Sequence, residues 1–93
     1  MIIGLYRARL HIPMCHSLKE KRSVLKRLIH RLRVADNCAV AEVGEHDVWQ
    51  SSEIAIVTVY NTREQVDQLF RGVEAKLNNG DDFQLVHSEI EFL

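Results

Sequence analysis

Proline, glycine and cysteine are scarce in this sequence: its 93 residues include one proline, four glycines and two cysteines. Two cysteines cannot supply the four thiolates that hold an iron–sulfur cluster, and we expect Cys15 and Cys38 to stay reduced because nothing else indicates secretion. The N-terminus lacks the basic region and apolar core of a signal peptide. No run approaches the ~18–20 apolar residues of a membrane span. We therefore expect one cytoplasmic domain over residues 1–93, with no membrane partner.

Metal-ligating and nucleophilic side chains are also few, and their spacing favours neither kind of site. No C-x-x-C or H-x-x-x-H pattern organises the candidate ligands, which are Cys15, His16, Cys38 and His46. Adjacent residues such as Cys15 and His16 rarely reach each other in the geometry of a nucleophile and its base. There is no glycine-rich phosphate loop. The sequence therefore predicts no metal site, no cofactor and no catalytic residue.

The longest connection, residues 44–50, contains the only tryptophan, Trp49. Its neighbours His46 and Asp47 have the chemistry of an acid–base pair, which leaves open a small enzyme that uses them. A tryptophan in such a loop more often packs the loop onto the domain, and a chain of this length has little room for an enclosed active site. We favour the structural role, and a protein without enzymatic activity.

Short periodic segments predict six elements of secondary structure. Alternation of apolar and polar residues indicates strands at both ends of the chain, and a serine or threonine three residues before Glu20 or Gln65 predicts the start of each of two helices. In chain order the predicted elements are a strand over 2–12, a helix from Ser17 to near Ala35, a strand over 38–43, a strand over 53–60, a helix from Thr62 to the Asn79-Gly80 stop, and a strand over 83–92.

This order is typical of the α+β ferredoxin-like split βαβ sandwich (βαββαβ), in which two helices cover one face of a four-stranded antiparallel sheet. The first and last strands are neighbours in that topology. We therefore expect Arg7 and Arg9 to face Glu89 and Glu91 across the outer face of the sheet. The same face also carries apolar side chains, which makes it a place where the sheet of a second copy can pack, as in a homodimer.

Charge is close to balanced in total but divided along the chain. Residues 1–35 contain nine Lys and Arg and one acid, for a charge of +8, whereas residues 36–93 contain three basic and twelve acidic residues, for −9. The net charge of −1 therefore does not exclude an anionic partner. Most of the positive charge lies in the first helix, on one exposed face formed by Lys19, Arg22, Lys26, Arg27 and Arg33.

The basic face has two interpretations. Charged helix faces are often only solvated, but this one lacks the acids four residues away that usually accompany such a face. We therefore interpret it as a surface for phosphates. The strand over 53–60 has no basic-Gly-aromatic run of an RNA-recognition sheet, so the helix is the expected route to RNA. Lys21 points toward the apolar side, and we expect its stem to be buried and its ammonium group to remain in water.

Five segments resemble one known family. They are Ser17-Leu18-Lys19-Glu20-Lys21-Arg22-Ser23, the strand before it, residues 41–44 (Ala-Glu-Val-Gly), residues 47–50 (Asp-Val-Trp-Gln) and the final strand. The family that they resemble is the YlxP-like family of small bacterial proteins of unassigned function. The resemblance covers nearly the whole chain and implies a ferredoxin-like fold. It also implies a role in translation or at the ribosome, because members are typically encoded beside translation-initiation and ribosome-maturation genes. No catalytic residue is established for the family, so none is transferred.

Two functions follow from these observations. The first is a non-enzymatic cytoplasmic module that contacts RNA or a ribosomal subunit through the basic face of its first helix, with little sequence preference. The alternative is a protein-interaction or self-assembly domain, in which the basic helix of one copy meets the acidic part of another to form a homo-oligomer.

Overall fold

The six predicted elements are present in the predicted order. A computed structural model describes residues 1–35 and 37–93, and its elements are β1 (Ile2–His11), α1 (Leu18–Ala35), β2 (Cys38–Gly44), β3 (Ser51–Tyr60), α2 (Arg63–Asn78) and β4 (Gln84–Phe92). The boundaries agree with those predicted to within two residues. In these parts of the chain no helix is both long enough and apolar enough to cross a bilayer.

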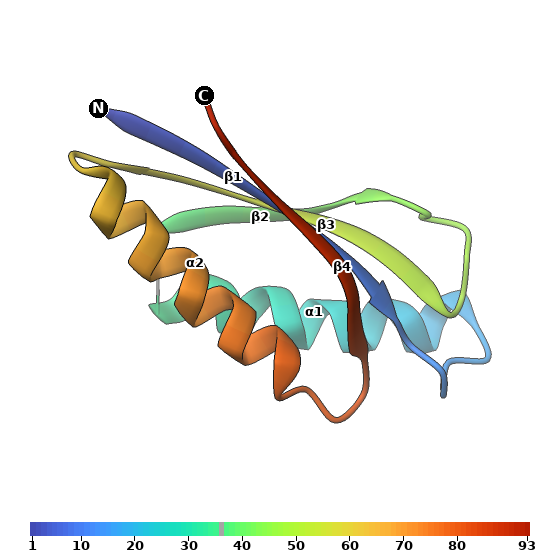
Figure 1. The fold of residues 1–93 in the computed structure, drawn as a ribbon. Helices are drawn as coiled ribbons and strands as arrows, with labels where there is room; N and C mark the ends of the chain where they lie inside the picture. Colours follow the sequence, from blue (N-terminus) through green and yellow to red (C-terminus); the bar gives the residue numbers. More distant parts are fainter. Residues whose placement is uncertain (36) are drawn as a thin grey trace.

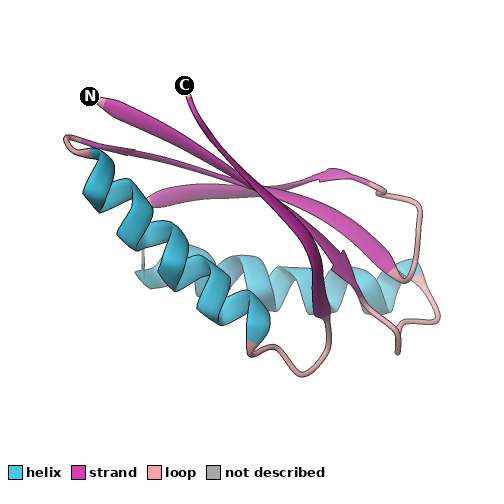
Figure 2. Ribbon diagram, in the orientation of Figure 1, coloured by secondary structure: helices cyan, strands magenta, loops and turns pink. Residues whose placement is uncertain are grey.

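The four strands form one antiparallel sheet in the order β2-β3-β1-β4. Both helices lie on the same side of this twisted sheet, and the two chain ends emerge close together at one end of it (Figure 1). The other side of the sheet carries no helix (Figure 2). This arrangement confirms the α+β ferredoxin-like fold with four antiparallel strands and two helices. It leaves β2 and β4 as the edge strands.

The core lies between the sheet and the helices. Alternate residues of β1, including Tyr6 and Leu10, point into it, and every third or fourth residue of each helix meets them. The rings of Tyr6 and Phe70 lie 5.5 Å apart between centroids. A side chain at Gly4 would place its Cβ 2.5 Å from a methyl carbon of Val66, so the glycine allows α2 to approach β1 closely.

The outer face of the sheet contains one of the two predicted cross-strand ion pairs. Arg7 lies opposite Glu89 on β4, and its guanidinium is 3.3 Å from the carboxylate. His87 also bonds that carboxylate at 3.0 Å. The hydrogen bond from His87, followed by the charge of Arg7, lowers the pKa of Glu89 below its usual value.

The second predicted pair does not form as expected. Arg9 lies opposite His87 on β4, and Glu91 lies opposite Leu5. The guanidinium of Arg9 instead approaches Glu53 on β3 at 3.9 Å. The sheet register explains the error: Arg7 already faces Glu89, and in an antiparallel pair the residues that follow Arg7 on β1 face those that precede Glu89 on β4. Both N-terminal arginines are therefore paired within the fold.

Candidate nucleic-acid interface

The first turn of α1 uses the only acidic residue of that helix. Ser17 Oγ accepts a hydrogen bond of 3.1 Å from the backbone N–H of Glu20, as predicted for a cap. The Glu20 carboxylate accepts a bond of 2.8 Å from the backbone N–H of His16, one residue before the expected partner Ser17. The single negative charge is therefore held at the helix end, and no acid interrupts the outer face of α1.

The apolar residues of α1 orient its cations. Leu25, Leu28 and Leu32 are buried against the sheet on one stripe of the helix. The helix contains seven Lys and Arg residues, and of these only Lys21 is buried. The other six, including all five residues predicted to form the basic face, are exposed.

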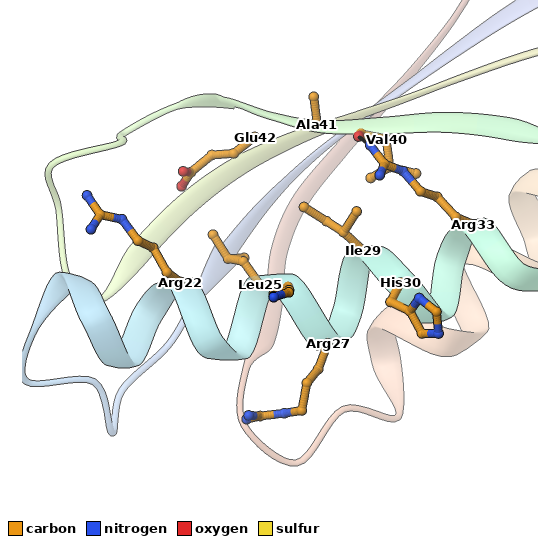
Figure 3. A pocket seen from close by; sticks show the side chains of 10 residues that line it. Arg22, Leu25, Arg27, Ile29, His30, Arg33, Val40, Ala41 and Glu42 are labelled. Carbon is orange, nitrogen blue, oxygen red and sulfur yellow. Dashed lines mark hydrogen bonds between the residues drawn. The ribbon is translucent and has the colours of Figure 1, made fainter.

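An open groove runs between α1 and the edge strand β2 (Figure 3). Its volume is about 720 Å³. Apolar side chains of Leu25, Ile29 and Val40 line it, together with Ala41. Its basic lining residues are Arg22, Lys26, Arg27, His30 and Arg33, and its one acid is Glu42. We call this feature the α1–β2 groove; it combines an apolar floor with a basic rim.

Three of the predicted cations have no anionic partner. Within residues 1–35 and 37–93, no carboxylate lies within ion-pair distance of Lys19, Arg22 or Lys26. All three are exposed. Arg22 and Lys26 line the α1–β2 groove, whereas Lys19 lies one turn earlier and outside the lining. Their charges are therefore available to a bound anion.

The other two predicted residues already have partners in the fold. Arg27 lies 3.4 Å from Asp82 in the connection between α2 and β4, and it donates to Ser23 Oγ at 2.8 Å. Its side chain points away from β2 (Figure 3). Arg33 points toward β2 and donates a bond of 2.6 Å to the backbone carbonyl of Val40. Arg27 therefore lines the α1–β2 groove with its guanidinium turned away from β2, and Arg33 is fixed at the far end of the groove.

The prediction for Lys21 is wrong, because its ammonium group is buried as well as its stem. The side chain is 1% exposed, and Nζ lies 2.9 Å from a carboxylate oxygen of Glu42 on β2. Nζ also donates a bond of 2.5 Å to the carbonyl of Glu45, while Ser52 Oγ donates to Glu42 at 2.6 Å. These acceptors compensate for the loss of water around the charge. The sequence signal for this burial was the position of Lys21 close to the apolar stripe of the helix.

The loop after β2 has an unusual backbone and an exposed aromatic ring. Glu45 has a φ of 59°, in the left-handed region that non-glycine residues seldom adopt. This conformation turns its carbonyl toward Lys21 and toward the N–H of Val48, which donates to it at 3.1 Å. Trp49 is 50% exposed, so it does not pack fully onto the domain. The ring of His46 forms a hydrogen bond of 3.2 Å with the backbone carbonyl of Glu42, and not with the carboxylate of its neighbour Asp47.

Cys15 does not lie in a reactive environment. Cys15 is buried, and this burial raises the pKa of its thiol, as do the nearby carboxylates of Glu20 and Asp82. A raised pKa opposes the thiolate form that a nucleophile or a metal ligand requires. In the described parts of the chain, no three His, Cys, Asp or Glu side chains are placed to hold a metal ion.

Comparison with known proteins gives a family but no activity. Residues 3–90 match the family described as "Protein of unknown function (DUF503)". The chain belongs to the DUF503 family. It is also 36% identical over 63 residues to the "Uncharacterized protein YlxP" of Bacillus subtilis, a match that covers 68% of each chain. These findings confirm the resemblance seen in the sequence. For this DUF503 protein, any function must therefore be argued from its own residues.

Proposed function

We propose that this DUF503 protein is a non-catalytic cytoplasmic module that binds RNA, or an assembly that exposes RNA such as a ribosomal subunit. The contacts are phosphates bound by the basic face of α1, which consists of Lys19, Arg22, Lys26, Arg27 and Arg33. The observation that supports this proposal is the absence of any ion-pair partner for Lys19, Arg22 and Lys26 within the described residues. Exposed cations that serve only solubility are usually accompanied by acids one turn away.

The dimensions of the basic face suit a nucleic-acid strand. Lys19 and Arg33 are fourteen residues apart in one helix, which corresponds to ~20 Å at 1.5 Å per residue. That length spans several phosphates of an RNA strand. Each phosphate contact releases counterions and gives a salt slope of about −0.7 on single strands, so three cations give a slope of about −2. Such contacts bring affinity with little sequence preference.

The test compares two double charge reversals. Arg22→Glu/Lys26→Glu removes two unpaired cations from the groove, whereas the control Arg31→Glu/Arg71→Glu changes two exposed arginines outside it. Both variants change the net charge equally. Affinity for a ribosomal RNA fragment is measured from about 50 to 300 mM salt. Relative to the wild type, we expect the groove variant to bind at least about 10-fold more weakly and the control to lose much less affinity. Equal losses, or no binding by the wild-type protein at the lowest salt, would contradict the proposal.

Self-assembly is the second candidate, supported by the outer face of the sheet. One half of that face holds the paired charges around Arg7, and the other half is apolar. The apolar half contains Ile3, Leu5, Ala39, Val57 and Val59, of which Val57 is 40% and Val59 46% exposed. Sedimentation separates two modes of association. A dimer through this face persists at high salt, whereas contacts between the basic helix and acidic surfaces dissociate. A monomer at every salt concentration would exclude both.

A further inference from the structure

Trp49 forms an exposed apolar surface. It belongs neither to the hydrophobic core nor to the proposed phosphate contacts. It is the only tryptophan of the chain, and half of its surface is accessible. Its neighbour Val48 is 46% exposed, and Met14 in the connection between β1 and α1 is 75% exposed. A large aromatic ring is left in water here at the end of the sheet.

The segment that carries this ring is fixed on several sides. Gln50, the next residue, donates side-chain hydrogen bonds to the carbonyls of Pro13 at 3.3 Å and Cys15 at 3.2 Å. Its own carbonyl accepts a 2.8 Å bond from the N–H of Ile12. At the other end of the loop, Lys21 binds the carbonyl of Glu45. The backbone on both sides of Trp49 is therefore held before any ligand binds, which lowers the backbone entropy lost on binding.

The loop lies at one end of the basic surface. It begins three residues after Glu42, which lines the α1–β2 groove. The bond from Lys21 holds it against the first turn of α1 (Figure 1). Of the unpaired cations, Arg22 follows Lys21 in the chain and lines the α1–β2 groove with Lys26, whereas Lys19 projects from the opposite side of the helix to Lys21. An aromatic surface and unpaired positive charges therefore occur together at this end of the molecule.

We propose that Trp49 is a stacking platform for an unpaired base of single-stranded RNA, whose adjacent phosphates bind Arg22 and, farther along the α1–β2 groove, Lys26. Single-stranded RNA presents bases that stack on aromatic side chains, whereas the bases of a duplex are already stacked on each other. Cations supply the phosphate contacts beside such a platform. This inference rests on the proposed function and specifies its ligand: a flexible single strand rather than an RNA helix.

The single tryptophan reports directly on stacking. The probe is oligoadenylate of about 8 nucleotides, within the ~4–16 nucleotides that single-strand sites cover. The control is an abasic oligomer with the same number of phosphates. We expect oligoadenylate to quench the fluorescence of Trp49, and the abasic oligomer to bind more weakly and leave the fluorescence unchanged. A duplex of equal length should also leave it unchanged.

Variants separate stacking from phosphate binding. Trp49→Ala should weaken oligoadenylate binding by about 10-fold while leaving the abasic oligomer unaffected, and Trp49→Phe should restore part of the loss. Val48→Ala, a matched loss of exposed apolar surface, should bind as the wild type does. If Trp49→Ala binds oligoadenylate normally while Arg22→Glu/Lys26→Glu does not, stacking is wrong and the phosphate surface remains. If the wild type binds the ribosomal RNA fragment but no oligomer, the single-strand site is wrong and the phosphate surface remains; if it binds neither, both proposals are wrong.

Discussion

The two helices cover the same sheet, yet their outer faces differ. Helix α2 contains three basic and three acidic residues, whereas α1 contains seven Lys and Arg and one acid. Each buries a regular apolar stripe: Leu25, Leu28 and Leu32 in α1, and Val66, Leu69, Phe70, Val73 and Leu77 in α2. Both are capped by a hydroxyl side chain, from Ser17 and Thr62 respectively.

This comparison distinguishes what folding requires from what it does not. The apolar stripe and the cap are common to both helices, and they suffice to place a helix on the sheet. The cation excess is confined to α1, so a helix of this fold does not need it. Like charges one turn apart reduce helix stability. Apart from Lys21, we therefore attribute this excess to the proposed binding of RNA and not to the stability of the fold.

The largest effect on stability is expected for a substitution of Lys21, the buried cation of α1. Lys21→Ala leaves the Glu42 carboxylate and the Glu45 carbonyl without their buried partner, and should lower the free energy of unfolding by about 3 kcal/mol. Lys19→Ala, two positions earlier and exposed, should change it by less than about 0.5 kcal/mol. Urea denaturation measures both. A loss below about 1 kcal/mol for Lys21→Ala would show that its ammonium group is hydrated.

A smaller change in stability, of opposite sign, is expected for a substitution on the basic face of α1. Lys26 has Arg22 four residues before it and His30 four residues after it. Lys26→Glu replaces repulsion by attraction, and should raise the free energy of unfolding by about 0.3 kcal/mol. The same variant should weaken RNA binding, because it reverses an unpaired charge in the groove. Urea denaturation at low salt, combined with an RNA titration, measures the two effects on one protein.

The corresponding charge reversal on α2 should lower stability instead of raising it. Arg71 has Asp67 four residues before it and Glu74 three residues after it. Arg71→Glu should therefore lower the free energy of unfolding by about 0.3 kcal/mol and leave RNA binding nearly unchanged. If Lys26→Glu and Arg71→Glu shifted stability in the same direction, the contrast between the two outer faces would have no energetic basis.

The sequence was sufficient for the fold because the fold depends on local patterns. Alternation along residues 2–12 and the helical spacing after Ser17 and Thr62 predict the six boundaries of three elements to within two residues. Strand register was less accessible. Cross-strand partners depend on the alignment of segments eighty residues apart, and Arg9 pairs with Glu53 on β3 rather than with an acid of β4.

The candidate site was predicted in part for a related reason. Helical spacing correctly predicts that Lys19, Arg22 and Lys26 are exposed, because exposure follows from the position of the apolar stripe. It does not indicate that Asp82 binds Arg27, that Val40 accepts a bond from Arg33, or that Glu42 faces Lys21. Each of these contacts joins α1 to a residue outside it, so each requires the tertiary arrangement.

The bonds from Arg33 and His46 to β2 have a consequence for behaviour at high concentration. An edge strand with free carbonyl groups is a template on which another chain can add a strand, the first step of sheet aggregation. The carbonyls of Val40 and Glu42 on this strand already accept bonds from those two side chains. An incoming strand must displace them before it can pair. The bonds from Arg33 and His46 therefore oppose the addition of a further strand at this edge of the sheet.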